Sequence, residues 1–556
     1  MESSEGETAT YVDSSQVGWS EQWRDALGPF WKWQLMLIGV LLFTAGTSLP
    51  LADPDLPMHL ATGEWIARHH AVPFTEPFAW TRAGAPFQAY SWAIELLYFE
   101  LMAHVGPIGL GVLQGITYVA LAAVMLVLGR VARWNPWVVL VMVAGNLIVT
   151  LGTTPYVRPQ SILLIATPLA WALVYRALDT RRLGLTLVGL LAVSTVLSNT
   201  HLLFPIALIP CVLLLTKPPA DRKRMVLVPA AIVLGWFLSP YALHWPEIFA
   251  LNFAKNAVLG PPSGINEYKP GFQMLMTGIE GSTVVGVLLA FLPWVAAKKL
   301  DARERFFHGG LWLAGLLLFA LALRSLVVWW LVTIPMSAVA LSLARTPAVP
   351  VVRTAQRAIV LVIFALVAAA GLETWEDPAL RAGDANMRYV PSINAKMIEP
   401  LVRWIECNTR PTDARLVTMF NFGGYFPWRL PRLSESIDGR TIFPDSVARA
   451  ETYFSAFKPE IPLQPWRTAD VAIFPVKFPV AAVLDTARGW HRVAMTNQLD
   501  GPSRMIGVWV TDDWWQRAGI GPVPRRVLPV MQSLDPRHTS CEALVPLPQS
   551  KRTGAP

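Results

Sequence analysis

Long uncharged runs recur along the first 372 residues, and they constrain the fold more than any other feature of this chain. The ten runs cover residues 33–52, 105–129, 134–157, 159–175, 183–216, 225–245, 281–297, 306–323, 325–344 and 358–372. A helix needs about 20 apolar residues to cross a bilayer, with about 17 as the lower range. The run 183–216 exceeds one span, and Asn199, Thr200 and His201 interrupt it. We therefore predict about eleven transmembrane helices, two of them short and joined by a tight turn at this triplet.

The composition is that of a membrane protein. Of 556 residues, 53% are hydrophobic, 15% are charged and 24 are tryptophans. A soluble domain carries about 25% charged residues, and tryptophan gathers at membrane–water interfaces. These values exclude an intrinsically disordered chain and argue against a wholly soluble enzyme. The N-terminal segment is polar and acidic, so we expect no cleavable signal peptide.

The basic residues of the loops indicate how the helices are oriented. Alternate loops lie on alternate sides, which puts 18 Lys and Arg on the side of the N-terminus and six on the other. The six are Arg68, Arg82, Arg158, Lys255, Lys269 and Arg324. Cytoplasmic loops carry the excess of Lys and Arg. We therefore predict a cytoplasmic N-terminus and, with an odd number of spans, an extracytoplasmic C-terminus. The net charge of +8 reports this orientation, and we expect no nucleic-acid partner.

The chain divides into a membrane part and a globular part. We predict a cytoplasmic segment at 1–32, a transmembrane domain at 33–372 with a long first outer loop at 53–104, an extracytoplasmic domain at 373–519, and a Pro-rich irregular tail at 520–556. In the outer domain we expect strands at 415–420, 470–475, 491–496 and 505–511, and helices at 398–407, 445–457 and 480–488. This alternation predicts a small α/β domain after the all-α membrane domain.

The first outer loop opens with two carboxylates and a histidine, Asp53, Asp55 and His59. Pro54 prevents the first helix from continuing and keeps Asp53 extended at the membrane boundary. Such a pair suits a general base, or a divalent cation such as Mg²⁺ or Mn²⁺. The alternative is that Asp53 and Asp55 cap a following helix. A cap explains one carboxylate, but it explains neither the second nor the length of the loop.

A second acidic residue of the same loop is Glu95, within an amphipathic stretch at 91–98 that is rich in Trp and Tyr. This pattern suits a helix that lies in the membrane interface. Glu95 is either a functional residue or an acid that reaches the surface. We expect the surface acid.

This layout resembles the GT-C glycosyltransferases, which use sugars linked to polyprenyl phosphate. In that superfamily an acidic motif begins a long first outer loop, and a soluble domain often follows the last span. The chain is similar to the protein O-mannosyltransferases and aminoarabinose transferases, and most similar to an uncharacterised bacterial branch. The motifs that carry the resemblance are Asp53 and Asp55, His59, Gly423-Gly424-Tyr425, and Asp438-Gly439-Arg440. The resemblance implies a GT-C-like fold in the bacterial inner membrane.

Some features depart from the characterised members. The Trp-Trp-Asp-Tyr-Gly acceptor motif of oligosaccharyltransferases is missing from the sequence, which argues against that activity. Met58 stands where the related branch more often has an aromatic residue. The Asn199-Thr200-His201 triplet lacks a following glycine. These departures leave the sugar and the acceptor open.

Four further polar residues are expected on the outer side: Arg158, His201, Glu267 and Arg324. Arg158 and Arg324 are either snorkelling anchors or a clamp for a phosphate group, which suits the planar guanidinium. His201 reads first as a hydrogen-bonded turn residue. All four, together with His59, are candidate substrate-binding residues.

Two glycine-containing motifs and two cysteines belong to the outer domain. Gly423-Gly424-Tyr425 reads first as a tight turn at a strand end, and Asp438-Gly439-Arg440 as a turn with a local ion pair. Cys407 and Cys541 are the cysteines of this domain. We expect them to be disulfide-bonded or both free and buried.

The leading hypothesis is an inverting glycosyltransferase. A sugar on a polyprenyl phosphate would pass to an extracytoplasmic glycan, lipid or protein. Asp53 would act as the general base for an acceptor hydroxyl, or would position that hydroxyl. Asp55 would assist, with or without a metal. Arg158 and Arg324 would neutralise the phosphate that leaves. The alternative is a non-catalytic membrane scaffold that binds an envelope polymer or protein through the outer domain. A transporter is disfavoured, because the spans hold few charges and show no repeat of broken helices.

Overall fold

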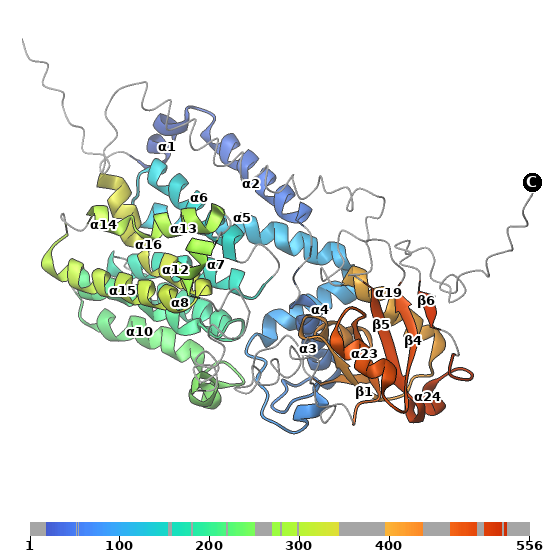
Figure 1. Ribbon diagram of the computed structural model, residues 1–556. Helices are drawn as coiled ribbons and strands as arrows, with labels where there is room; N and C mark the ends of the chain where they lie inside the picture. Colours follow the sequence, from blue (N-terminus) through green and yellow to red (C-terminus); the bar gives the residue numbers. More distant parts are fainter. Residues whose placement is uncertain are drawn as a thin grey trace, which may run out of the picture.

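The computed structural model places a large group of helices beside a small sheet formed by the C-terminal part of the chain (Figure 1). The structure describes residues 18–49, 51, 53, 55–153, 158–179, 182–217, 221–250, 270–277, 281–296, 300–343, 395–436, 468–496, 505–524 and 527–530. Of the expected features, the run 358–372, the helix 445–457, and the residues Glu267, Asp438, Gly439, Arg440 and Cys541 lie outside these ranges.

The described helices of the membrane part follow the uncharged runs. They are α1 (Trp19–Leu27), α2 (Trp31–Ser48), α3 (Leu56–His69), η1 (Trp80–Arg82), α4 (Trp92–Val105), α5 (Pro107–Val131), α6 (Pro136–Thr153), α7 (Gln160–Asp179), α8 (Leu183–Ser198), η2 (Phe204–Cys211), α9 (Val212–Thr216), α10 (Lys223–Trp236), η3 (Ala242–His244), α12 (Gly271–Thr277), α13 (Gly281–Ala290), α14 (Pro293–Ala296), α15 (Ala302–Leu321), η7 (Leu323–Ser325) and α16 (Leu326–Leu343). The predicted first loop contributes α3, η1 and most of α4.

Four helices within the described residues are long and apolar enough to cross a membrane. They are Pro107–Val131, Gln160–Leu178, Leu183–Thr200 and Leu323–Ser342. A fifth is added if α1 and α2, which are bent by 77° at a short break, form one span. The apolar helices Pro136–Leu151 and Phe204–Thr216 are shorter. The chain therefore has several apolar helices, and the count of about eleven spans stays a prediction.

The long run 183–216 is broken where the polar triplet predicted it. Helix α8 ends at Ser198, and η2 begins at Phe204 after the turn. The Asn199 amide donates to the backbone oxygens of Thr195 at 2.7 Å and Leu238 at 3.2 Å. Backbone groups freed at such a break must find partners, because lipid offers none. Asn199 provides such partners and so fixes the turn.

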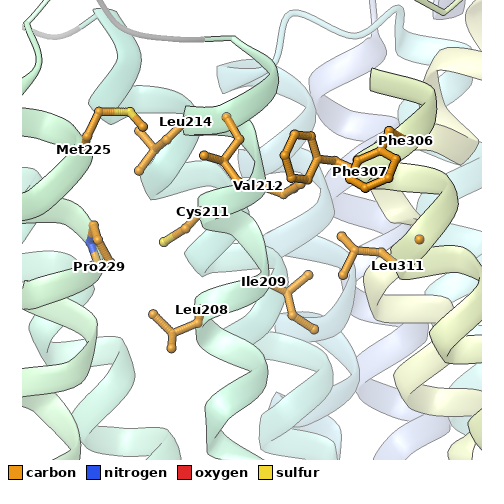
Figure 2. Close-up of a pocket in the computed structure, with 12 residues that line it drawn as sticks. Leu208, Ile209, Cys211, Val212, Leu214, Met225, Pro229, Phe306, Phe307 and Leu311 are labelled. Carbon is orange, nitrogen blue, oxygen red and sulfur yellow. The ribbon is translucent and has the colours of Figure 1, made fainter. Parts of the chain in front are cut away.

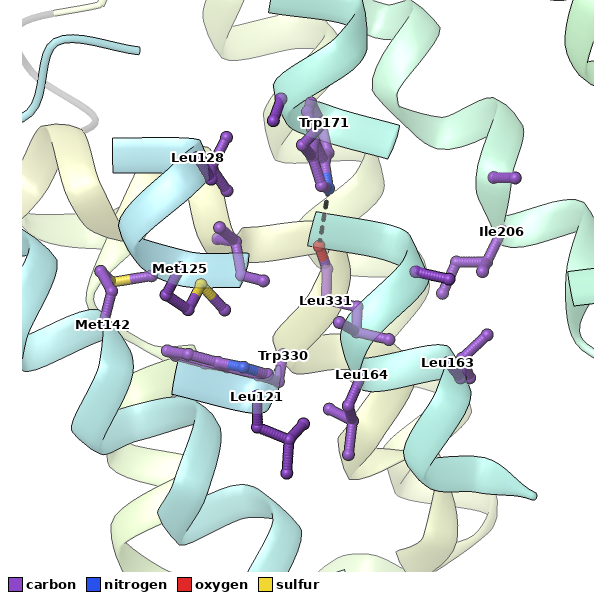
Figure 3. Close-up of a cluster of buried hydrophobic side chains, with 14 of the residues drawn as sticks. Leu121, Met125, Leu128, Met142, Leu163, Leu164, Trp171, Ile206, Trp330 and Leu331 are labelled. Carbon is purple, nitrogen blue, oxygen red and sulfur yellow. Dashed lines mark hydrogen bonds between the residues drawn. The ribbon is translucent and has the colours of Figure 1, made fainter. Parts of the chain in front are cut away.

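Tryptophans hold the helices together through hydrogen bonds inside an apolar core (Figure 3). The indole of Trp171 on α7 donates to the Leu331 backbone oxygen on α16 at 3.2 Å. The indole of Trp330 on α16 donates at 3.1 Å to the side-chain oxygen of Asn146 on α6. The Asn146 amide in turn donates to the Leu121 backbone oxygen on α5 at 3.2 Å. These bonds link α5, α6, α7 and α16 at fixed positions. Apolar packing alone would discriminate weakly between alternative alignments of one helix along another.

The C-terminal part contains a six-stranded mixed sheet in the order β2-β1-β3-β5-β4-β6. Its elements are α19 (Ala395–Asn408), β1 (Ala414–Thr418), α20 (Phe420–Gly423), α21 (Tyr425–Arg429), β2 (Leu433–Glu435), β3 (Val471–Pro475), α23 (Pro479–Thr486), β4 (Trp490–Thr496), β5 (Ile506–Thr511), α24 (Asp512–Ala518) and β6 (Leu528–Val530). Strand β1 is parallel to β2 and β3, and β5 is antiparallel to β3 and β4. The expected strands β1, β3, β4 and β5 and helices α19 and α23 are confirmed. Cys407 is disulfide-bonded, and Cys211 is free.

Hydrogen bonds connect the first loop, residues 53–104, to strands β1 and β2 of the sheet. The indole of Trp80 donates to the Leu416 backbone oxygen of β1 at 3.2 Å. The Phe78 backbone oxygen accepts from the Glu435 backbone at 3.1 Å and from the Ser434 hydroxyl at 2.7 Å. These hydrogen bonds hold the C-terminal sheet against the loop that begins with Asp53 and Asp55.

Candidate functional site

Asp53 and Arg158 form a buried ion pair at the start of the first loop. Arg158 Nε lies 2.7 Å from Asp53 Oδ2, and Nη2 lies 2.9 Å from Oδ1. The guanidinium therefore binds both carboxylate oxygens, the geometry that gives the strongest pairs. The Asp53 side chain has no exposed surface, and that of Arg158 is 14% exposed. Asp53 precedes α3 and Arg158 precedes α7, so two distant turns of the chain meet here.

Asp55 is the accessible carboxylate of the pair. Its Oδ2 lies 3.5 Å from Arg158 Nη2, and its side chain is 43% exposed. Asp55 occupies the position before the first residue of α3, yet its side chain makes no capping hydrogen bond. Asp53 Oδ1 accepts from the Asp55 backbone at 3.0 Å. Helix capping therefore does not account for the Asp55 side chain, and two carboxylates share one guanidinium.

His59 and Glu95 form a second pair beside the first. His59 Nδ1 lies 2.8 Å from Glu95 Oε1. Burial alone would lower the pKa of His59, but the hydrogen bond and charge of Glu95, followed by the charges of Asp55 and Asp53, raise this pKa above its usual value. Glu95 is 7% exposed, so the expectation of a surface acid is wrong. The amphipathic face of α4 is covered by α3, which supplies the histidine.

The close approach of α3 and α4 depends on Gly63. A Cβ atom at this position would lie 2.2 Å from the Glu95 backbone oxygen and 2.7 Å from the Phe99 Cβ. Both separations are far below van der Waals contact, so only glycine allows this crossing. Gly63 lies one turn after His59 on α3. The helix contact that glycine permits is therefore the one that brings His59 to Glu95.

His201 and Arg324 come from two separate turns, the turn after α8 and η7 between α15 and α16. His201 is 8% exposed, and its Nδ1 accepts from the Leu203 backbone at 3.0 Å. This confirms it as a hydrogen-bonded turn residue. Arg324 is exposed in η7, near enough for its charge to act on His201. The structure thus places Arg324 with His201, and Arg158 with Asp53 and Asp55.

Two hydrogen bonds connect the His201 turn to the helix that carries Glu95. The Asn199 side-chain oxygen accepts from the Trp92 indole at 2.7 Å, and the Asn199 backbone oxygen accepts from the Ala93 backbone at 3.1 Å. The beginning of α4 is therefore held by the turn after α8.

A small cavity of about 20 Å³ adjoins Arg158. It is lined by Ile94, Tyr98, Leu113, Gln114, Thr117, Tyr118, Arg158, Ser161 and Ile162. This volume holds about one water molecule. Gln114 is 2% exposed, and neither polar atom of its amide has a hydrogen-bond partner within the described part of the chain. Gln114 is a single amide within an apolar run, and polar residues in such runs are candidates for a functional role. This pattern could have identified Gln114 from the sequence.

Comparison with solved structures identifies the architecture. The archaeal oligosaccharyltransferase AglB from Archaeoglobus fulgidus, in complex with an inhibitory peptide and a dolichol-phosphate, superposes with a TM-score of 0.53 at 12% identity. The match covers 81% of this chain and 70% of AglB. This chain has the GT-C fold.

Two further structures of this class are similar over more of their length. They are ArnT from Cupriavidus metallidurans bound to undecaprenyl phosphate and in the apo state, with TM-scores of 0.47 and 0.44. Identities are 14% and 13%, over 86% of this chain in both cases. The sequence matches no family model and no curated protein.

In this GT-C chain, the motif Gly423-Gly424-Tyr425 lies where two short helices meet, and the expected turn is found at Gly424. Gly423 ends α20, and Gly424 has the α-helical φ of −60° just before α21. The motif delivers the Tyr425 hydroxyl to the Glu399 carboxylate, which also pairs with Arg429 at 2.8 Å. Burial alone would raise the pKa of Glu399, but Arg429 brings it below its usual value.

Helix α21 carries this network to the site. Trp428 packs against an apolar cluster of first-loop and α5 residues that includes Leu56, Ile94 and Tyr98. Sequence reasoning missed this group because Glu399 lies 26 residues before Tyr425 and 30 before Arg429. Their ion pair stabilises the segment that covers α3.

The carboxylates bind an arginine in the position where the sequence suggested a metal. Within the described ranges, no group of three or more His, Cys, Asp and Glu side chains is placed to hold a metal ion. The Arg158 guanidinium lies against both Asp53 and Asp55. Divalent cations such as Mg²⁺ need several oxygen ligands around one point. A cation at this pair would therefore have to displace Arg158 from both carboxylates.

Proposed function

We propose that this chain is a membrane glycosyltransferase that moves a sugar from a polyprenyl-phosphate donor to an extracytoplasmic acceptor. The observation that carries the proposal is the buried pair of Asp53 and Arg158 at the start of the first outer loop, on the GT-C fold. The AglB structure of that fold holds a dolichol-phosphate, which supports a lipid-linked donor. The sugar and the acceptor are not specified by these observations.

The reaction needs one proton acceptor and one stabiliser of negative charge. The acceptor hydroxyl attacks the anomeric carbon, and a carboxylate takes its proton as the new C–O bond forms. The bond between that carbon and the donor phosphate breaks, and the polyprenyl phosphate leaves with the electron pair. We assign the proton acceptor to the Asp53 and Asp55 pair. Arg158 and Arg324 stabilise the charge that develops on the leaving phosphate.

Arg158 links these two roles. In the structure its guanidinium occupies both oxygens of Asp53, so these oxygens are engaged and do not accept the proton of the acceptor hydroxyl. We propose that the donor phosphate draws Arg158 away, since phosphate accepts the same planar fork. Asp53 then loses its counter-charge and becomes the general base. Asp55, already exposed, makes the first contact with the acceptor hydroxyl.

We assign supporting roles to the remaining candidates. His59, held by Glu95, lies in the first turn of α3, directly after the carboxylates, and donates to the acceptor or donor sugar. His201 contributes from the turn after α8 and Arg324 from η7, and Glu267 stays a proposed substrate-binding residue on sequence grounds. A divalent cation at Asp53 and Asp55 also stays a prediction, and transfer measured with and without EDTA decides it.

The test uses the full-length protein in proteoliposomes with a panel of undecaprenyl-phosphate-linked radiolabelled sugars and an extract of envelope acceptors. We expect label to move to an acceptor with wild type and with Glu100→Gln, a partly exposed carboxylate on α4. Asp53→Asn should not transfer. A chain that binds acceptor material but transfers no sugar from any donor would favour the scaffold instead.

A further inference from the structure

An apolar cavity of about 570 Å³ lies between three helical segments far from the carboxylates in the sequence. Figure 2 shows side chains from η2 and α9, from α10 and from α15 around it. We call it the inner groove, and its lining residues are Leu208, Ile209, Cys211, Val212, Leu214, Leu215, Met225, Pro229, Phe306, Phe307, Gly310 and Leu311. The volume falls within the range of about 300–1,000 Å³ of ligand pockets. None of these side chains is charged, so the groove suits a hydrocarbon chain.

Basic residues gather at one end of the inner groove. Leu215 is followed by Lys217, Met225 is preceded by Arg222, Lys223 and Arg224, and Phe306 is preceded by Arg303 and Arg305. Lys217, Arg222, Lys223, Arg303 and Arg305 are exposed, whereas Arg224 binds the backbone oxygens of Ala177 and Leu178.

The nearby acids do not cancel this charge. Asp221 and Asp301 each accept a backbone N–H at a helix start, from Lys223 and Glu304 respectively. With Glu304 they supply three negative charges against five exposed positive ones. No ion pair of Arg222, Lys223, Arg303 or Arg305 is found within the described residues. The rim therefore retains positive charge directly above an apolar groove.

The charged rim and the carboxylate site lie at opposite ends of the helices. The segment Phe204–Thr216 begins next to the His201 turn on the outer side and ends at Lys217. The loop charges predict that Lys217 and Arg303 face the cytoplasm. A lipid whose headgroup lies at this rim therefore belongs to the inner leaflet, whereas the proposed donor is used at the outer end.

We propose that the inner groove binds one anionic phospholipid of the inner leaflet. Its acyl chain lies among the residues that line the groove, and its phosphate lies on Lys217, Arg222, Lys223, Arg303 and Arg305. Basic pockets between helices on the cytoplasmic side bind such headgroups. The lipid would contact both α10 and α15, whose side chains line opposite sides of the groove (Figure 2).

Two neighbouring glycines give a matched test. A Cβ atom at Gly309 or at Gly310 meets no atom within 4 Å, so leucine fits at either position without a backbone clash. Gly310 lines the groove and Gly309 does not. Both changes replace glycine in the same helix turn, so their effects on helix stability are equal to first order.

The measurement is native mass spectrometry of the full-length, delipidated protein titrated with phosphatidylglycerol or phosphatidylcholine of identical acyl chains. We expect wild type to bind phosphatidylglycerol about tenfold or more tightly than phosphatidylcholine, given the contribution of each basic residue. Gly310→Leu should weaken phosphatidylglycerol binding by a similar factor, and Gly309→Leu should leave it unchanged. The combined changes Arg222→Gln, Lys223→Gln, Arg303→Gln and Arg305→Gln should lower it to the phosphatidylcholine level.

Arg130→Gln with Arg133→Gln, in the last turn of α5 and in the turn after it, is the control for charge lost elsewhere on the same predicted side. Equal binding of the two lipids would overturn the proposal, as would equal effects of the two glycine variants or of the two charge sets. Tighter binding of undecaprenyl phosphate than of phosphatidylglycerol would also overturn it, by assigning the groove to the carrier lipid. The exposed charge variants keep the test valid if Gly310→Leu fails to fold.

Discussion

Arg158 donates two hydrogen bonds to the fully buried carboxylate of Asp53, although 105 residues separate them in the chain. The pair joins the end of the first span region to the start of α7. It also leaves Asp55, 3.5 Å from the same guanidinium, as the carboxylate that solvent reaches. The proposed chemistry and the stability of the site thus depend on the same side chains.

Replacing Asp53 by Asn should lower sugar transfer by about 10²–10⁴-fold, the contribution of a general base. The amide keeps the size of the side chain but does not accept the acceptor proton. Transfer by proteoliposomes is the measurement, with Glu100→Gln as the control and size-exclusion profiles to check folding. Full activity of Asp53→Asn would move the search for the base to Asp55, His59 or Glu267.

Arg158→Ala should lower the free energy of unfolding by about 3–5 kcal/mol, because it leaves the buried Asp53 carboxylate without its counter-charge. Arg158→Lys keeps the charge and loses the planar fork, so it should cost less stability but still weaken donor use. The double variant Asp53→Asn with Arg158→Ala should be more stable than the sum of the two single changes. Thermal unfolding of all variants in one detergent measures this coupling, and strict additivity would contradict the pairing.

The pair of His59 and Glu95 should make stability depend on pH. The pKa of His59 is raised in the folded state above its usual value of 6.5. The stabilisation is therefore fully present below that value and is lost as pH rises through the folded pKa. Glu95→Gln should therefore lower the Tm more near pH 5.5 than near pH 8. The unfolded chain is taken to have the unperturbed pKa of histidine.

Glu100→Gln is the control for this experiment as well, because Glu100 also pairs with a histidine, His104, but at the surface. Surface pairs contribute little, so its Tm difference should stay small at both values of pH. A Glu95→Gln difference that is the same at both would show that the pair does not titrate.

Arg324→Ala should raise the KM for the polyprenyl-phosphate donor while the fold is retained, because the side chain is exposed at the outer turn beside His201. Arg68→Ala is the matched control, since Arg68 is another outer-side arginine, paired with Glu64 on α3. Steady-state kinetics over a range of donor concentrations separates the two. Equal KM values for both variants would assign Arg324 to membrane anchoring.

Reporter fusions test the orientation on which both proposals rest. A reporter after Pro219 should be cytoplasmic and one after Gly383 extracytoplasmic, because the basic residues favour the loops on the first side. Alkaline phosphatase and a fluorescent protein give opposite readouts at the two sites. Both fusions on one side would contradict the predicted topology.

Local patterns in the sequence predicted elements whose cause is local. Asn199 marks the break in a long apolar run because its side chain binds backbone oxygens that lipid would leave without partners. The strands β1, β3, β4 and β5 are rich in β-branched and apolar residues. Glu95 was misjudged because an amphipathic pattern does not reveal whether another helix covers the face. The glycine pair predicted the turn that Gly424 forms, but it did not reveal the short helices on either side of that turn. The pairing of Asp53 with Arg158 depends on how distant spans pack, which no local pattern encodes.

Gly63 contributes no polar atom to the site, yet the ionisation of His59 rests on it. Any side chain there would push α4 away from α3, because a Cβ would lie 2.2 Å from the Glu95 backbone oxygen. The carboxylate would then move out of reach of the imidazole. A search for active-site residues that considers only ionisable groups would therefore overlook the position most sensitive to adding a single methyl group.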